Sequence, residues 1–304
     1  FSTRKFSWNT TLTLSHNKNS VKALTGEAVQ LYEAKFGFNQ NTHRIAVGEP
    51  LGQFYGYITE GLYQVDDFNY DASTQTYTLK DGVPYHGDKG QIRPGMWKFK
   101  NLTGDDNVID ENDKTVIGNA QPKFYGGLNN SFTYKGFDLS IFLTFSYGNE
   151  VLNATKLVTS KVGSLNYNAL DVMNSSNRWM TINSDGQKVT DPGELAALNA
   201  GKTVAAYHDA QQGDNYIHSW AVEDASYLKL SNVTLGYTFP KNLIARVGLK
   251  NLRLYATGNN LLTWTKYSGF DPEVSTMKSG LTPGVDFGAY PLSRSFIFGL
   301  NVAF

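Results

Sequence analysis

The last residues of the chain alternate between large apolar side chains and mostly smaller ones. In RSFIFGLNVAF, from Arg294 to Phe304, every even-numbered position after Arg294 is apolar. These positions are Phe296, Phe298, Leu300, Val302 and Phe304. Because successive side chains of a strand point to opposite faces, this pattern predicts a strand with one strongly apolar face. The other face carries Ser295, Ile297, Gly299, Asn301 and Ala303.

Two neighbouring segments have the same period. Residues 124–134 place apolar residues on even positions, and residues 137–147 place them on odd positions. Lys135 and Gly136 separate the two runs, as the two-residue turn of a hairpin does. Each run is about 11 residues long, the length that a tilted strand needs to cross a bilayer.

Further strands are predicted elsewhere in the chain. They span about Phe6 to Leu14, Ala46 to Ile58, Tyr227 to Phe239, Leu252 to Thr263 and Leu292 to Phe304. The third of these is irregular, because Leu228 and Leu230 have the opposite parity to Val233. A strand already under way near the first residue, with no signal peptide before it, predicts a piece of a longer protein.

The connections between these strands fall into two kinds. Short ones, at Lys135-Gly136 and from Pro240 to Asn251, alternate with long polar ones of about Thr59 to Lys123, Gly148 to Ser226 and Trp264 to Pro291. If consecutive strands are antiparallel, all long connections emerge at one end of the sheet. Outer-membrane barrels sort their loops in this way. The alternative is a secreted β-sandwich with one buried face per sheet.

Composition narrows the function classes. Lys+Arg and Asp+Glu number 27 each, so no net field favours nucleic acid. Cysteine is absent, which excludes disulfides, thiolate metal sites and a cysteine nucleophile. The sequence contains no nucleophile elbow, zinc-protease motif or phosphate-binding loop. The five histidines are scattered, so we expect no catalytic site and no enzyme.

Several separated motifs, in family order, resemble SusC/RagA-type TonB-dependent outer-membrane transporters. They are GQFYGYITEGLYQ (52–64), the segment from Arg93 to Phe142, NRWM (177–180), YLKLSNVTLGYTFP (227–240), LRLYATGNNLLTWTKYSGFDPEV (252–274) and YPLSRSFIFGLNVAF (290–304). The resemblance implies an all-β fold, a segment of an antiparallel transmembrane β-barrel with long extracellular loops. About seven strands of a barrel of about 22 would be present, roughly its last third.

The resemblance also implies a role. Residues 1–304 would be the C-terminal portion of the barrel, with the plug and the N-terminal strands absent. Transporters of this kind import large nutrients, oligosaccharides or peptides, across the bacterial outer membrane with energy from TonB, which acts through the plug. A SusD-like surface lipoprotein forms a lid, and dimers of transporter-lid pairs are implied. The alternative function is a soluble or surface-anchored carbohydrate-binding β-sandwich module.

One loop has recognisable ion chemistry. In residues 101–113, oxygen-bearing side chains recur at the spacing of a calcium-binding loop. The departures are an Asp at the usual glycine position and Asn112 where a bidentate Glu is needed. We therefore expect a structural turn capped by its own Asp and Asn side chains. The alternative is a weak Ca²⁺ site formed by Asp105, Asp110 and Asp113, and no other cofactor is expected.

Candidate substrate contacts lie among the aromatic residues of the longest loop. Trp179, Tyr216 and Trp220 are the weak candidates, because aromatic rings stack on sugars and neighbouring polar groups bind hydroxyls. The favoured alternative is that these side chains pack the loop or face the lid.

Finally, the resemblance gives the terminal strand a meaning. Its even-numbered residues would face lipid, and Phe304 would be the aromatic signal that the outer-membrane assembly machinery reads.

Overall fold

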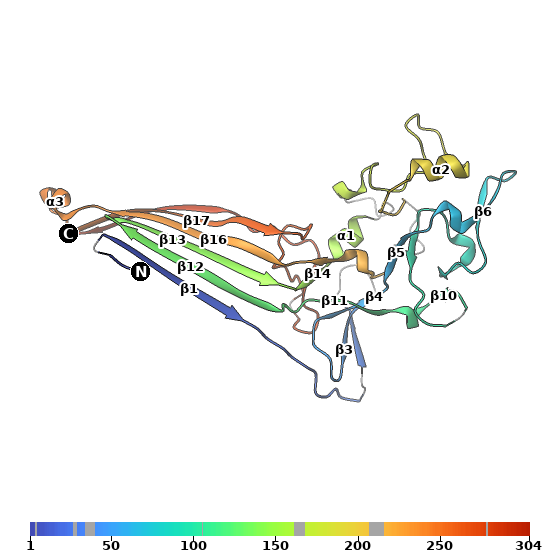
Figure 1. Ribbon diagram of the computed structural model, residues 1–304, viewed down its shortest axis with the longest axis horizontal. Helices are drawn as coiled ribbons and strands as arrows, with labels where there is room; N and C mark the ends of the chain where they lie inside the picture. The colour runs from blue at the N-terminus through green and yellow to red at the C-terminus, as the bar shows by residue number, and fades with distance from the viewer. Residues whose placement is uncertain are drawn as a thin grey trace.

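The structure, a computed structural model, describes residues 1–3, 5–26, 29–33, 40–104, 106–160, 168–206, 216–277 and 279–304. It consists of a long antiparallel sheet with a layer of loops at one end (Figure 1). The sheet has six strands in the order β1-β12-β13-β16-β17-β19. Their bounds are β1 Phe6–Ser15, β12 Phe124–Tyr134, β13 Phe137–Tyr147, β16 Tyr227–Thr238, β17 Asn251–Thr265 and β19 Ser295–Ala303.

The loop layer holds short strands and helices. The strands are β2 Val29–Glu33, β3 Asn41–Ala46, β4 Gln53–Gly56, β5 Thr59–Leu62, β6 Phe68–Asp71, β7 Thr76–Leu79, β8 Tyr85–His86, β9 Trp97–Phe99, β10 Val108–Ile109, β11 Thr115–Asn119, β14 Glu150–Asn153, β15 Val222–Asp224 and β18 Val285–Asp286. The α-helices are α1 Ala154–Thr159 and α2 Pro192–Leu198, with α3 Lys241–Ile244 at the far end of the sheet. The 3-10 helices are η1 Val65–Asp67, η2 Lys89–Gln91, η3 Glu111–Asp113, η5 Asp171–Met173, η6 Ser219–Ala221 and η7 Ala245–Val247. Within the described ranges, no helix is long and apolar enough to cross a membrane.

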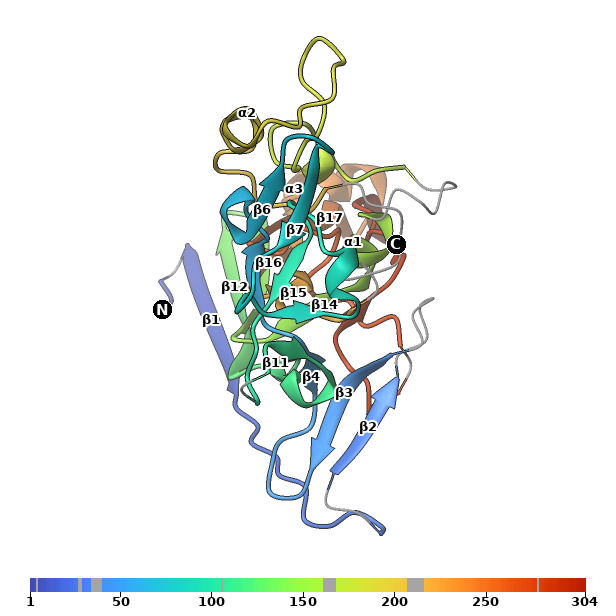
Figure 2. The ribbon, with the colours of Figure 1, turned by 90° about the vertical axis from the view of Figure 1, so that its right-hand side faces the viewer.

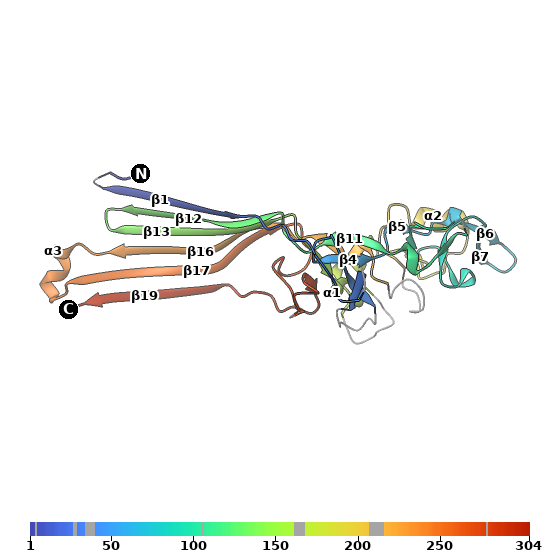
Figure 3. The same cartoon turned by 90° about the horizontal axis from the view of Figure 1, so that it is seen from below.

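The connections are sorted between the two ends of the sheet. Lys135-Gly136 joins β12 to β13, and the short α3 segment joins β16 to β17 at the same end (Figure 3). The long connections, 16–123, 148–226 and 266–294, all emerge at the opposite end. This confirms the predicted sorting of short turns and long loops. The sheet has six strands, one fewer than the sequence predicts.

One face of the sheet carries continuous apolar rows that run across the strands. One row is Trp8, Phe132, Leu139, Leu235, Ala256 and Phe298, and another is Leu12, Leu128, Leu143, Leu230 and Leu262. Many of these side chains are exposed, Phe298 to 81%. An apolar face left open to its surroundings is the arrangement of a strand that meets lipid.

A β-bulge explains the irregular pattern of the strand near residue 230. The register of β16 shifts at Ser231, against β13 on one side and β17 on the other. One extra residue reverses the parity of everything before it. Leu228 and Leu230 therefore lie on the same face as Val233, opposite Phe145 and Leu143.

Aromatic side chains gather at both ends of the apolar face. At the short-turn end, the rings of Phe137 and Tyr237 are 4.5 Å apart, and Phe239 follows at 5.0 Å from Tyr237. At the loop end, Phe124 stacks on Tyr147 with ring centroids 4.9 Å apart. Such rows are typical of the interfacial girdles of membrane barrels.

The hydrophobic core lies in the loop layer and not against the sheet. Its largest cluster joins Tyr57, Trp97 and Phe99 to Trp179, and a second one surrounds Phe54 and Leu152. Figure 1 shows the loop layer beyond the ends of the long strands, and Figure 2 shows the same layer from the loop end. No second sheet packs face to face on the six strands within the described residues, so the sandwich alternative is wrong.

The predicted strand from Ala46 to Ile58 is also wrong as a barrel strand. Residues 48 and 52 are glycines with positive φ angles, and the chain turns between β3 and β4. Phe54 is fully buried, and β4 pairs with β11 and β3 in a four-stranded sheet of the loop layer. The apolar alternation of residues 46–58 arises because one side of these short strands packs into the core of the loop layer. Half-buried strands show this alternation whether they meet lipid or a protein core.

Candidate functional site on the inner face

The second face of the six-stranded sheet is polar. Thr234 and Thr257 are joined by a 2.9 Å hydrogen bond, and Asn232 donates to Asn259 at 2.7 Å. Asn259 in turn donates to Ser295 at 3.0 Å, which links three strands. In a membrane barrel the polar face encloses the lumen. We therefore call it the inner face, and the apolar one the outer face.

An ion pair crosses three strands of the inner face near the short turns. Arg253 of β17 donates from Nε and Nη2 to Asp138 of β13 at 3.0 and 2.5 Å. Gly236 of β16 lies beneath the pair, where a Cβ atom would be only 2.5 Å from both partners. A side chain at this position would push the two charges apart. The glycine therefore allows a bidentate pair to span the intervening strand.

A second charged cluster lies at the loop end of the inner face. Lys229 of β16 is 4% exposed and forms an ion pair with Glu273, while Asp271 lies 3.7 Å away. The hydroxyl of Tyr227 donates to Glu273 at 2.5 Å. These contacts hold the segment after β17 against the inner face. Two carboxylates on one buried ammonium satisfy a charge that burial would otherwise make costly.

The carboxylate of Glu223 connects this region to helix α1. Lys156 donates to Glu223 at 3.0 Å, and Ser268 donates from both its backbone N–H and its hydroxyl at 2.8 Å. Burial works to raise the pKa of Glu223, but the Ser268 hydrogen bonds and the Lys156 ammonium outweigh it and hold the pKa below its ordinary value. The carboxylate therefore stays ionised and fixes three loop segments together.

A hollow of about 550 Å³ opens beside this network. Its polar lining includes Asn153, Asp171 and Asn177, and its apolar lining includes Leu170 and Phe270. Phe270 is 76% exposed, so its ring is uncovered on most sides. Apolar walls with a few polar groups are typical of ligand sites of this size. The hollow can take a ligand that has both an apolar surface and hydrogen-bonding groups.

The hollow lies on the inner side of the loop layer. Asn149 and Val151 line a smaller hollow together with Tyr227 of the inner face. Asn153 continues the same parity along β14, so it points to the same side. A ligand passing along the inner face would meet this hollow.

The aromatic candidates from the sequence occupy the loop core. Trp179 is 1% exposed, and Tyr216 packs edge-on against Tyr57 at 5.2 Å. Trp220 lies 4.9 Å from Trp97, and the Lys156 ammonium lies 4.1 Å from its ring. These three side chains connect separate loop segments. Substrate contact through them stays a prediction.

The loop at residues 101–113 uses its acidic groups on its own backbone. Asp113 is buried and accepts hydrogen bonds from the N–H groups of Leu102, Thr103 and Asp110 at 2.6 to 2.9 Å. Asp110 accepts from the Asn112 N–H at 2.7 Å. Asp105 lies outside the described residues. Within those residues no three His, Asp or Glu side chains are close enough to hold a metal ion. The Ca²⁺ alternative stays a prediction.

The proposed assembly signal, Phe304, is 81% exposed at the short-turn end. It follows β19, whose last residue accepts a hydrogen bond from the Lys250 N–H at 2.8 Å. Its role as an assembly signal stays a prediction.

Sequence reasoning missed the charged clusters. Lys229 was embedded in the motif YLKLSNVTLGYTFP, and Glu273 in the motif ending FDPEV. A single lysine inside a membrane strand is a usable signal, because a charge there requires a partner or an aqueous lumen. Its partner could not be found, since 44 residues separate the two.

Comparison with known proteins identifies the class. No protein-family model matches the chain. TonB-dependent receptor P3 of Formosa agariphila is 33% identical over 98% of the chain, which spans 27% of that receptor. TonB-dependent receptor P39 of the same organism is 30% identical over 99% of the chain and 29% of its own length. The chain is therefore part of a TonB-dependent receptor of the outer membrane.

Within this class the chain is similar to the SusC/RagA type. TonB-dependent receptor SusC of Bacteroides thetaiotaomicron is 26% identical over 99% of the chain, which spans 25% of SusC. The solved RagAB peptide transporter superposes on the whole chain and on 28% of its own chain, with a TM-score of 0.65 at 20% identity. This likeness confirms the fold, a segment of the transporter barrel. The relatives are receptors and not enzymes, as predicted.

Proposed function

We propose that the chain forms part of the wall and of the outer loops of an importer that brings large nutrients across the outer membrane. The observation that supports this most is the pairing of two unlike faces in one sheet. Continuous apolar rows meet lipid on one side, and a hydrogen-bonded polar face with a hollow lies on the other. A wall of this kind lets polar cargo pass through an apolar membrane. The chain spans about a quarter of its relatives, so transport belongs to the intact receptor.

The cargo in this proposal is an oligosaccharide or a peptide. The name of the RagAB transporter, which says that it carries peptides, supports the peptide class. The hollow beside Phe270 suits either class, because an uncovered ring can pack on a sugar face or on an apolar side chain. TonB would supply the energy through the plug, which lies outside this chain.

The partner in this proposal is a SusD-like lipoprotein lid, in a dimer of transporter-lid pairs. RagAB, whose name joins two components, supports such a partnership. The loop layer is the part of this chain that a lid would contact, because it is the end that projects beyond the sheet (Figure 1).

Binding by the intact receptor tests the proposal. Replacing Phe270 with Ala should weaken the binding of oligosaccharide or peptide cargo by about fivefold or more, the loss expected for an aromatic contact at the centre of a site. Tyr290→Ala is the control, because Tyr290 is exposed in the same long loop but does not line the hollow. Equal affinity of both variants and the native receptor, for every cargo that it imports, would contradict this site.

A further inference from the structure

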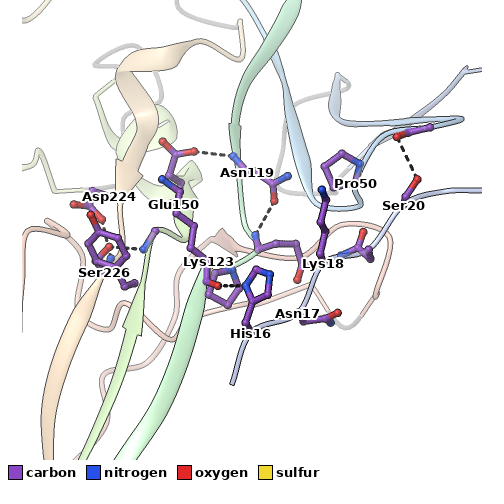
Figure 4. A pocket seen from close by; sticks show the side chains of 16 residues that line it. His16, Asn17, Lys18, Ser20, Pro50, Asn119, Lys123, Glu150, Asp224 and Ser226 are labelled. Atoms are coloured by element: carbon purple, nitrogen blue, oxygen red, sulfur yellow. Dashed lines mark hydrogen bonds between the residues drawn. The ribbon is translucent and has the colours of Figure 1, made fainter. Parts of the chain in front are cut away.

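A second hollow, of about 950 Å³, lies at the loop end of the sheet and is separate from the candidate cargo site. Figure 4 shows it between the end of β1 and the first strands of the loop layer, with side chains from both parts turned toward it. Its lining includes His16, Lys18, Lys123, Glu150 and Asp224.

The strand register places this hollow on the outer side of the wall. Tyr147 lines it, and Tyr147 belongs to the outer face because it pairs with Phe124. Glu150 and Asp224 also line it and pair with each other across β14 and β15. Their neighbours in sequence, Asn149, Val151 and Glu223, point to the inner side, where they line the smaller hollow or bind Ser268 and Lys156. Alternation along a strand therefore separates the two sides.

The aromatic girdle indicates the level of the hollow relative to the membrane. The Phe124–Tyr147 ring stack marks the loop end of the outer apolar face, and the hollow begins directly beyond it. In a membrane barrel such rings lie at the boundary between hydrocarbon and headgroups. The hollow is therefore at the level of the headgroups of the outer leaflet.

The charged side chains of the hollow differ in whether they already have a partner in the protein. Lys18 and Lys123 are exposed, and neither is in an ion pair within the described residues. His16 donates from Nδ1 to the Lys123 carbonyl oxygen at 2.5 Å, which holds the β1 extension beside Lys123. The carboxylates are already engaged: Glu150 accepts from the Asn119 N–H at 2.7 Å, and Asp224 from the Ser226 N–H at 2.9 Å.

We propose that this hollow binds the phosphate-bearing headgroup of an outer-leaflet lipid through Lys18 and Lys123. Two exposed ammonium groups that form no ion pair with the described part of the chain match an anionic headgroup, and a volume near 950 Å³ accommodates one. The acyl chains of the same lipid would lie along the apolar rows below the girdle. A lipid held here would fix the overhanging segment 16–20 against the ends of β12 and β13.

The test uses the intact receptor in detergent, titrated with diphosphorylated lipid A and followed by native mass spectrometry. Each of Lys18→Glu and Lys123→Glu should weaken lipid binding at least about fivefold, the contribution of one basic residue near an anionic surface. Lys241→Glu is the matched control, since Lys241 is exposed at the opposite end of the sheet and should leave binding unchanged.

Three outcomes would overturn the proposal. Both glutamate variants, correctly assembled, could bind lipid A as the native receptor does. Inorganic pyrophosphate could compete with lipid A at equal concentration, which would indicate a site for free phosphates. A cysteine at position 18 could be blocked from a small thiol reagent in delipidated receptor, which would show that another part of the receptor fills the hollow. None of these readouts depends on cargo transport.

Discussion

Lys229, a buried side chain of strand β16, forms an ion pair with Glu273, which lies in the segment that follows β17. The pair joins the rigid wall to a loop that also lines the hollow at Phe270. Removing one of these charges should therefore loosen the loop that borders the candidate cargo site.

Replacing Lys229 with Met should release this loop. Glu273 and Asp271 would be left without their shared cation, and because the Glu273 side chain is 39% exposed to solvent the loss costs about 1 kcal/mol. Amide hydrogen exchange in residues 267–277 should accelerate accordingly, while exchange in β12 stays slow. Lys266→Met is the control, because Lys266 is exposed in the same region. Unchanged exchange in the Lys229 variant would show that the loop is held by other contacts.

The two faces of β13 should respond differently to the same charge. Ile141 lies on the outer face opposite Val233, and Ser140 lies on the inner face opposite Thr234. Ile141→Arg should destabilise the barrel by about 2–4 kcal/mol, because the arginine would enter the hydrocarbon near its middle. Ser140→Arg should have a much smaller effect. Urea unfolding of the intact receptor in lipid vesicles measures both, and the reverse order would show that the faces are misassigned.

Acid should loosen the contact between β3 and the last long loop. His43 is buried, accepts from Thr42 at Nδ1 and donates from Nε2 to the Pro283 carbonyl at 2.9 Å. Burial lowers its pKa to about 4, although the Pro283 hydrogen bond opposes this. The neutral form is therefore the folded one, and its contribution is complete above the unfolded pKa near 6.5.

As the pH falls from about 6.5 toward 4, the unfolded loop binds a proton that the folded loop rejects, which removes about 3 kcal/mol of local stability. Hydrogen exchange near residues 41–46 should rise across this range. His43→Gln should abolish most of the pH dependence, whereas His16→Gln, at an exposed histidine, should preserve it. A profile that is flat in the native receptor would contradict this role for His43.

Removing Phe304 should impair assembly more than stability. The residue is exposed at the end of the chain's last strand, so its loss removes little packing from the finished sheet. The amount of receptor in the outer membrane should fall severalfold, and the fraction that does assemble should unfold at nearly the native urea concentration. Phe1→Ala is a matched control at another exposed aromatic residue. Equal membrane levels of the truncated and native proteins would count against an assembly signal.

The sequence predicts the membrane part of the fold well, and the reason is physical. A strand between lipid and lumen has a different solvent on each side, so residues 137–147 alternate with few exceptions. The bulge at Ser231 hides the same pattern in β16, because one inserted residue reverses the parity. The bulge can be placed only when the neighbouring strands supply the register.

The loop layer was much less predictable. Its contacts join residues far apart in the chain, such as Trp97 with Trp220, and short strands leave little periodicity to detect. Ala46 to Ile58 alternates like a membrane strand but folds into a small sheet. The hollow beside Phe270 likewise combines residues from four separate stretches of the loop layer, so local spacing does not reveal it.

The location of the hydrophobic core has a consequence for how this protein is made. The clusters around Phe99 and Leu152 are sheltered from water by other loops, whereas no described segment packs over the face of the sheet that carries Phe298, which is 81% exposed. The first kind of burial can be completed in water, and the second only in a bilayer. The two parts of the polypeptide therefore fold in different surroundings, one in water and one in the bilayer. A denaturant or a detergent that unfolds one part can leave the other part folded.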